Sequence, residues 1–187
     1  MQYESDTLTC RAGSDLPADF DDLYQSHYRR VFGLCLRLLG HRTQAEDAAQ
    51  ETFVRAYRAF GRYDRSRPFA AWVLEIASNH CVDLIRRRSR EDALAGDPEA
   101  ELSALPADDA GALGALISAE QGSALRDAID ALPDRYRVPI VLAYYGDASY
   151  DDIAARMDIT RNHVGVLLLR ARQRLRQALT DQEAPDR

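Results

Sequence analysis

The chain has 187 residues, of which 46% are hydrophobic and 29% are charged, and its formal net charge is −6. This length allows one domain or two small ones with packed cores. No apolar run approaches the roughly 20 residues of a membrane span, and the acidic residues 1–20 lack the apolar segment of a secretory signal. We therefore expect a cytoplasmic protein.

The negative charge is concentrated in two segments. Residues 1–22 hold six acids and one arginine, and residues 91–120 hold eight acids and no basic residue. The remainder is net basic, and every basic residue of the chain is an arginine. Because planar guanidinium groups suit phosphates and guanine, this charge pattern is compatible with a nucleic-acid partner.

Residues 19–92 are predicted to form a first domain of three long helices. The first helix follows an apolar stripe with a helical period and ends before Gly40. The third begins near Pro68, which suits the first turn of a helix. Its predicted core face is lined by Phe69, Trp72, Val73, Ile76, Ala77, His80 and Leu84. No segment alternates as a strand would, so the predicted fold class is all-α.

The second helix is expected to open with a capping box of Thr43 and Glu46 and to close at Gly61. One face carries apolar residues for the core. The other face is formed by Asp47, Gln50, Glu51 and Val54. Taken alone, this polar face is also explained by an ordinary solvated helix surface.

The third helix ends in a cluster of arginines at positions 86, 87, 88 and 90. Four like charges in five residues repel one another unless an anion binds them. A solubilising helix end is the alternative interpretation.

Residues 93–120 are predicted to be a mostly disordered acidic linker, because their apolar residues are small or isolated among glycines and prolines. Residues 1–18 and 181–187 are expected to be flexible tails. Cys10 belongs to the N-terminal tail, whereas Cys35 and Cys81 fall in apolar helical patterns and are predicted to be buried free thiols.

Residues 121–180 are predicted to form a second domain of four helices. The first ends at Leu132 and Pro133, and the second covers residues 134–145 with Gly146 as its stop. A pair of crossing helices follows over residues 150–176. Its apolar positions are Ile153, Ala154, Met157, Ile159, Val164, Leu167, Leu168 and Ala171.

The crossing pair carries the caps and the turn of a helix-turn-helix. Ser149 with Asp152 is expected to cap its first helix, and Thr160 its second. Asp158 occupies the turn, where a left-handed backbone is expected and Asp is tolerated.

The second helix of the pair matches a DNA-reading helix. Arg161, Asn162 and His163 lie at its N-terminus, where such helices contact base edges. The arginines that follow, able to contact phosphates, are Arg170, Arg172, Arg174 and Arg176. The alternative is an amphipathic helix pair with a solvated basic face.

No motif predicts an enzyme, a cofactor or a metal site. The four histidines are scattered over different helices, and no nucleophile–base pair, glycine-rich phosphate loop or metal-ligand cluster is present. His27 and His80 lie on apolar stripes and are interpreted as core residues rather than ligands.

These motifs, in this order, resemble the bacterial sigma factors of the extracytoplasmic-function group of the sigma-70 family. AEDAAQETFVRAY (residues 45–57) looks like the polymerase-binding helix of that group, and FAAWVLEIASNHCVDLIRRRSR (residues 69–90) looks like the helix and turn that recognise the minus-10 element. Residues 125–157 are similar to the opening of region four, and the following ARQRLR fits its basic close.

The resemblance implies a region-two domain and a region-four helix-turn-helix domain that together bind core RNA polymerase and promoter DNA. Its polymerase-binding residues would be Asp47, Gln50, Glu51 and Val54. Its minus-10 residues would be Ser78, Asn79, Arg86, Arg87 and Arg88. Its minus-35 residues would be Thr160, Arg161, Asn162, His163, Val166, Arg170, Arg172 and Arg174. It also implies an anti-sigma partner, which can be membrane-bound, no cofactor and no small-molecule substrate.

Two other interpretations remain open at this point. The protein could be a DNA-binding regulator that uses its helix-turn-helix alone, although the polar face at Asp47 and Glu51 argues against this. It could also be a protein-interaction module that sequesters partners without initiating transcription. Binding to core polymerase tests the first alternative, and run-off transcription tests the second.

Overall fold

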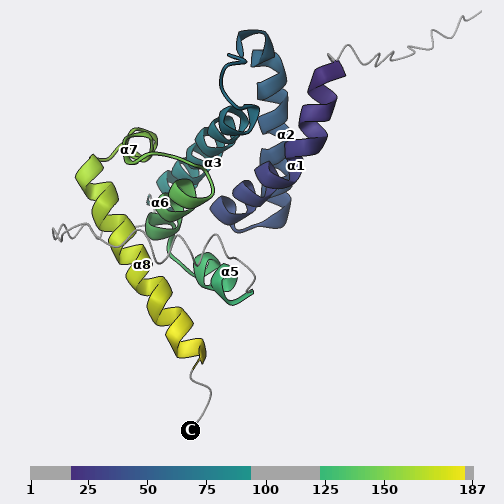
Figure 1. Ribbon diagram of the computed structural model, residues 1–187. Coiled ribbons are helices and arrows are strands. Elements are labelled where there is room, and N and C mark those ends of the chain that lie inside the picture. Colours follow the sequence, from purple (N-terminus) through teal and green to yellow (C-terminus); the bar gives the residue numbers. More distant parts are fainter. Residues whose placement is uncertain (1–17, 94–122, 184–187) are drawn as a thin grey trace, which may run out of the picture.

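The computed structural model describes residues 18–93 and 123–183, and every regular element in these two stretches is helical (Figure 1). The first half, residues 18–93, contains α1 (Ala18–Leu39), α2 (Arg42–Ala59), the short 3-10 helix η1 (Phe60–Arg62) and α3 (Phe69–Ala93). The second half, residues 123–183, contains α5 (Ser123–Asp130), α6 (Asp134–Tyr144), α7 (Tyr150–Met157) and α8 (Arg161–Glu183). The predicted linker and tails lie outside the described residues, apart from the ends of helices.

The first half is a three-helix bundle in which α1, α2 and α3 all contact one another. Small side chains on α2, including Ala45 and Ala49, are fully buried and let α1 and α3 approach closely. At one end, Phe20 packs edge-to-face on Phe60 and Phe69. The bundle therefore holds the outer face of α2 on a rigid support.

The capping box of Thr43 and Glu46 predicted at the start of α2 is wrong. The helix begins at Arg42 with His41 as N-cap, and no side chain supplies a capping hydrogen bond. Glu46 instead accepts from Arg42 Nε at 2.9 Å, four residues earlier. The predicted stop at Gly61 also needs correction, because that residue lies in η1, which continues directly from α2. Among the glycines of the described residues, Gly40, just before α2, has a positive φ, of 73°.

The second half is built on α8, which packs against α5, α6 and α7. The predicted caps of the helix-turn-helix are confirmed. Ser149 Oγ accepts from the Asp152 backbone N–H at 3.2 Å, and the Asp152 carboxylate accepts from the Ser149 N–H at 3.0 Å. Asp158 is left-handed with φ 56°, and Thr160 Oγ1 accepts from the His163 N–H at 3.2 Å.

Replacing Ser149 with alanine is expected to lower the free energy of unfolding by about 0.5–2 kcal/mol, because the Asp152 backbone N–H loses its acceptor and the Asp152 carboxylate loses the Ser149 hydroxyl as a donor. Chemical denaturation followed by circular dichroism measures this loss. The matched control is Thr43→Ala, since Thr43 does not cap α2 and its removal should change stability little. Equal losses in the two variants would contradict the different roles of these residues.

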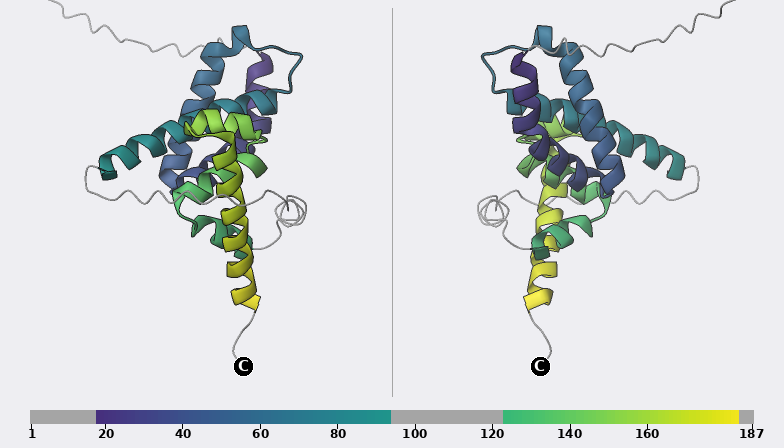
Figure 2. Two further views of the ribbon diagram at one scale, coloured as in Figure 1. Left: turned by 90° about the vertical axis from the view of Figure 1, so that its left-hand side faces the viewer. Right: turned by 90° about the vertical axis from the view of Figure 1, so that its right-hand side faces the viewer.

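The two halves pack against each other, with α6 on α1 and α7 on α3 (Figures 1 and 2). Buried side chains from both halves belong to one connected apolar cluster.

Cys35 and Cys81 are both buried free thiols, as predicted, and a hydrogen bond from one thiol to the other, together with burial, raises the pKa of Cys81. Each helix within residues 18–93 and 123–183 is too short or too polar to cross a bilayer.

Candidate functional site

The predicted polar face of α2 is on the surface of the bundle. Asp47 and Gln50 are exposed, Glu51 is half-exposed, and Val54 is 41% exposed. Their spacing of three and four residues puts all four on one side of the helix. Glu51 accepts a hydrogen bond from Arg55 Nε at 2.8 Å, and this bond holds the pKa of Glu51 below its usual range. The face is therefore anionic at neutral pH.

An apolar hollow of about 380 Å³ adjoins this face. Gln50 and Val54 line one side, and Tyr57, which is 39% exposed, lines another. The floor is aromatic, with Phe20 from α1 and Phe53 from α2. Sequence reasoning missed Tyr57 as a candidate, although it lies three residues after Val54 on the same helix side. An anionic helix face beside an apolar hollow fits a basic, amphipathic partner helix.

A second hollow, of about 540 Å³, lies on the other side of the same acids. Asp47 and Glu51 line it together with His80 and Arg87 of α3. His80 is half-buried, and burial lowers its pKa below the usual value, with a further contribution from Arg55. Arg87, predicted to contact the minus-10 region, therefore lies next to the predicted polymerase-binding acids.

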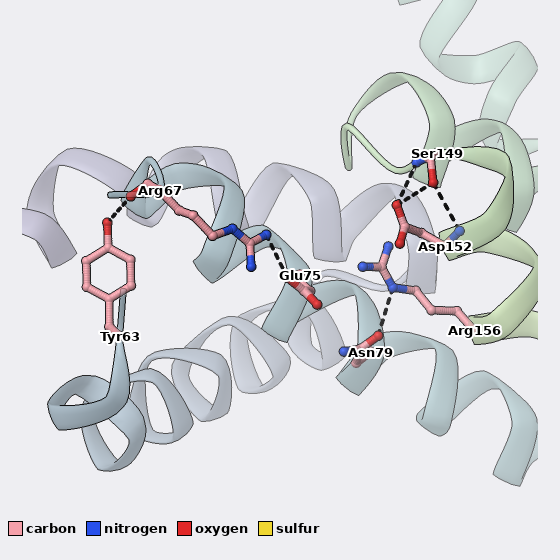
Figure 3. A network of polar contacts seen from close by, with 7 residues as sticks. All are labelled: Tyr63, Arg67, Glu75, Asn79, Ser149, Asp152 and Arg156. Atoms are coloured by element: carbon pink, nitrogen blue, oxygen red, sulfur yellow. Dashed lines mark hydrogen bonds and ion pairs between the residues drawn. The ribbon is translucent and has the colours of Figure 1, made fainter. Parts of the chain in front are cut away.

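The other predicted minus-10 residues face the second half of the molecule. Ser78 is fully buried, and Asn79 is exposed but accepts from Arg156 Nε of α7 at 2.8 Å (Figure 3). Arg86 lines hollows between α3 and α7. Arg88 is ion-paired to Asp134 of α6 at 2.8 Å. Asn79 and Arg86 thus lie on the side of α3 that faces α7, whereas Arg88 contacts α6 and also lines the hollow beside the acids of α2.

The N-terminus of α8 is open to solvent. Arg161 and Asn162 are exposed, His163 is half-buried, and Arg161 is ion-paired with Asp151 of α7. Val166 and Arg170 follow Asn162 at intervals of four residues, so the three lie along one side of the helix. The buried side is formed by Val164, Leu167, Leu168, Ala171, Arg172 and Leu175.

Arg172 is inside the domain and is not placed to contact phosphate. Its Nε donates to Tyr144 Oη at 3.2 Å and its guanidinium NH2 to Tyr150 Oη at 3.4 Å. Burial opposes the charge, but these hydrogen bonds outweigh it and raise the pKa of Arg172. Arg174 is exposed, and its guanidinium carbon lies 4.8 Å from the ring centre of Tyr136. The helical period puts Arg172 on the same side as Leu168 and Leu175 and puts Arg174 on the other side, a signal that the prediction did not use.

Within the described residues, no group of three or more histidine, cysteine or acidic side chains could hold a metal ion. The two candidate surfaces are the anionic face of α2 and the N-terminus of α8, where exposed Arg161 is ion-paired with Asp151.

Comparison with known proteins supports the division of the chain into two halves. Residues 23–91 match the family model of sigma-70 region 2, and residues 123–175 match that of sigma-70 region 4. The ECF RNA polymerase sigma factor SigW of Bacillus subtilis is 34% identical over 176 residues, which cover 91% of this chain and 92% of that protein. SigE of Mycolicibacterium smegmatis is 34% identical over 162 residues, covering 86% of this chain and 61% of that protein.

Solved structures share the fold. The sigma factor RpoE of Bartonella quintana, crystallised with the anti-sigma factor NepR, has a TM-score of 0.57 at 21% identity and covers 87% of this chain and 97% of its own. CnrH, in complex with the cytosolic domain of CnrY, has a TM-score of 0.50 at 24% identity and covers 88% of this chain and 89% of its own.

An all-helical chain with matches to region 2 and region 4 in this order has the make-up of a sigma-70 protein. The chain belongs to the extracytoplasmic-function group of the sigma-70 family. Its function is that of an RNA polymerase sigma factor, which directs transcription initiation at particular promoters.

Proposed function

We propose that the chain binds core RNA polymerase through the outer face of α2 and reads promoter DNA with α3 and α8. In this assignment residues 19–92 form the region-two domain, residues 93–120 the acidic linker and residues 121–180 the region-four domain. The protein acts in the cytoplasm by binding alone, without catalysing a reaction. The anionic face of α2 beside its apolar hollow is the observation that carries the polymerase assignment.

Two kinds of contact would operate at the α2 face. Asp47 and Glu51 would meet cationic side chains of the polymerase, and Gln50 would add a hydrogen bond. Val54, already exposed, would bury apolar surface, with Tyr57 beside it in the hollow. Charge complementarity of this kind fixes orientation and speeds encounter, whereas apolar anchors supply much of the affinity.

The minus-10 element would be bound by α3. Ser78 and Asn79 would hold an unstacked base, since an amide and a hydroxyl can hydrogen-bond to the edge of a flipped base. Arg86, Arg87 and Arg88 would contact phosphates nearby.

The minus-35 element would be read by α8 in the major groove. Arg161, Asn162 and His163 lie at the helix N-terminus, and Val166 and Arg170 continue the same side. Thr160 serves this site as the cap that fixes the first turn. Arg174, being exposed, would contact phosphate, whereas Arg172 supports the domain from inside.

An anti-sigma protein is proposed as a regulatory partner. The support comes from RpoE and CnrH, whose solved structures are complexes with NepR and with the cytosolic domain of CnrY. Such a partner could reside in the membrane and hold the sigma factor there until a signal releases it.

Transcription with purified components tests the proposal. Core RNA polymerase plus this protein should produce transcripts from genomic DNA that start at a limited set of positions, and sequencing their ends would define both promoter elements. Stable polymerase binding without new transcripts would favour a sequestering module. DNA binding without polymerase binding would favour an independent regulator.

A further inference from the structure

Two consecutive residues at the start of α7 hold the guanidinium of Arg161, the first residue of α8. Asp151 Oδ2 accepts a hydrogen bond from the guanidinium NH1 of Arg161. The guanidinium carbon of Arg161 lies 5.9 Å from the ring centre of Tyr150. A carboxylate at the edge and an aromatic ring near the face restrict the planar group in two directions.

This contact lies at the surface, so it contributes little to folding. The side chains of Arg161 and Asp151 are 63% and 69% exposed, and ion pairs between solvent-exposed side chains stabilise proteins little. The pair instead determines the direction in which Arg161 presents its remaining hydrogen-bond donors.

The second edge of the Arg161 guanidinium is left for a ligand. Among the described residues, NH1 is the nitrogen of Arg161 that has a hydrogen-bond partner. Nε and NH2 are further donors in the same fixed plane. Guanine offers two acceptors, N7 and O6, on its major-groove edge, and arginine binds both at once. An arginine that is held at NH1 therefore suits the reading of a guanine by its other edge.

The acid at position 151 has one explanation that involves no ligand. Asp151 lies in the first turn of α7, where the helix dipole favours a negative charge. The dipole does not account for the arginine that pairs with it from α8. DNA phosphates also repel an acid at this surface, so Asp151 lowers the general attraction of the helix-turn-helix for DNA. Orienting Arg161 is a role that offsets this cost.

The turn that carries Asp151 is held at several points. The capping box at the start of α7 joins its first turn together, and Ile153 is fully buried in the core. From α8, the guanidinium NH2 of Arg172 donates to Tyr150 Oη at 3.4 Å. The acceptor of Arg161 is therefore carried by a fixed helical turn, which can set the orientation of a side chain at the neighbouring helix start.

We propose that Asp151 is a specificity-determining residue of the minus-35 reader, because it positions the guanidinium of Arg161 for a guanine in the major groove. The inference rests on the proposed reading of the minus-35 element by α8. Asp151 does not contact the base and acts through Arg161. Tyr150 supports the same orientation from the face of the guanidinium.

Base preference is the property that tests this assignment. The full-length protein, in complex with core RNA polymerase, would be measured on a promoter identified from its own transcripts and on variants of each minus-35 position. Arg161→Ala should lower the preference for guanine at one position by at least about fivefold. Asp151→Ala should lower the preference at the same position by at least about threefold and leave the other positions as in the parent.

The effects of the two changes should not add. Once Arg161 is replaced by alanine, Asp151 has no guanidinium to position, so the double variant should show the preference of Arg161→Ala alone. Asp151→Asn keeps an oxygen acceptor and should retain more of the preference than Asp151→Ala. Additive losses in the double variant would overturn the positioning role.

Two controls separate positioning from loss of charge and from loss of stability. Asp127→Ala removes an exposed acid from α5 of the same half. Tyr144→Phe removes the hydroxyl that accepts from Arg172 Nε, so it should lower the free energy of unfolding without altering the contacts of Arg161. Both variants should keep the guanine preference. If either relaxed it as much as Asp151→Ala, the positioning role would be rejected.

A purely electrostatic role of Asp151 gives a different result. Removing an acid near DNA should raise affinity for all promoters alike. If Asp151→Ala changed affinity equally across the panel and kept the guanine preference, Asp151 would only adjust the charge, and the proposal would be wrong.

Failure of the proposed function can be distinguished from failure of this inference. A parent complex that does not discriminate among minus-35 bases would contradict the reading of that element by α8. If the parent discriminates and Arg161→Ala retains the full preference, reading by α8 stands on its other residues, and the role of Asp151 is rejected.

Discussion

Replacing Asp47 and Glu51 together with arginine is expected to weaken binding to core RNA polymerase by about 2–5 kcal/mol, which is the cost of leaving close cationic partners unpaired and repelled. Both side chains lie on the outer face of α2, away from the buried alanines that hold the bundle. The helix should remain folded, because the lost Glu51–Arg55 pair is exposed and such pairs contribute little to stability.

The matched control carries the same change of total charge elsewhere. Asp22→Arg with Asp127→Arg alters one exposed acid in each half, outside the α2 face. Affinity for core polymerase would be measured by fluorescence anisotropy at two salt concentrations, with circular dichroism of each variant. If the control lost as much affinity as the α2 variant, general charge repulsion would explain the loss. Unchanged binding of a folded α2 variant would remove this face from the polymerase interface.

Tyr57 offers a second way to examine the same face. Tyr57→Ala would remove ring surface from the apolar hollow without altering charge. Its effect on affinity should not depend on salt, in contrast to that of the acids. The two variants therefore distinguish apolar from electrostatic contributions to one interface.

The local features of the helix-turn-helix could be predicted from sequence because each depends on residues only a few positions apart. Ser149 and Asp152 make their reciprocal hydrogen bonds within one turn, and Asp158 adopts the left-handed conformation that a tight turn requires. The all-α fold followed for the same reason, since long stripes with a helical period are visible without knowledge of the tertiary contacts.

Two features were missed, one local and one that depends on distant residues. Thr43 and Glu46 match a capping box, but Glu46 pairs with Arg42, which the pattern did not consider. Arg172 belongs by sequence to a basic stripe, yet two tyrosines from α6 and α7 accept its hydrogen bonds inside the domain. The spacing of Arg172 from Leu168 and Leu175 puts it on the buried side of α8, but only the packing of α6 and α7 shows which groups accept its hydrogen bonds.

The candidate site also has local features that the sequence indicated and a long-range contact that it did not. The sequence indicated the outer face of α2 because i, i+3 and i+4 spacing alone puts Asp47, Gln50 and Glu51 together. It did not indicate that α7 lies over Asn79, because residues 79 and 156 are brought together only by the packing of the two halves. The DNA-binding roles of these residues stay predictions.

Arg170→Ala is expected to weaken binding of the polymerase complex to its preferred promoter by about 1–3 kcal/mol and to relax discrimination at one or two positions of the minus-35 element. The reason is geometric. Arg170 lies eight residues after Asn162, on the side of α8 away from Val164 and Leu168, and is half-buried beside the surface that would enter the groove. A guanidinium in the groove can form two hydrogen bonds with guanine, and no other base offers both acceptors.

Variants of two neighbouring arginines distinguish base reading by Arg170 from a structural role and from a phosphate contact. Arg172→Leu should lower the free energy of unfolding, by about 1.5–3 kcal/mol if its bonds to Tyr144 and Tyr150 have the strength usual for charged donors, without changing base preference in the molecules that remain folded. Arg174→Ala should weaken binding to all promoters alike and reduce the salt slope by about 0.9 if one phosphate contact is lost. A panel of single-base promoter variants, measured with each protein in the polymerase complex, distinguishes the three. If Arg170→Ala lowered affinity equally across that panel, Arg170 would be a phosphate contact, and base reading would have to come from Arg161, Asn162 and His163.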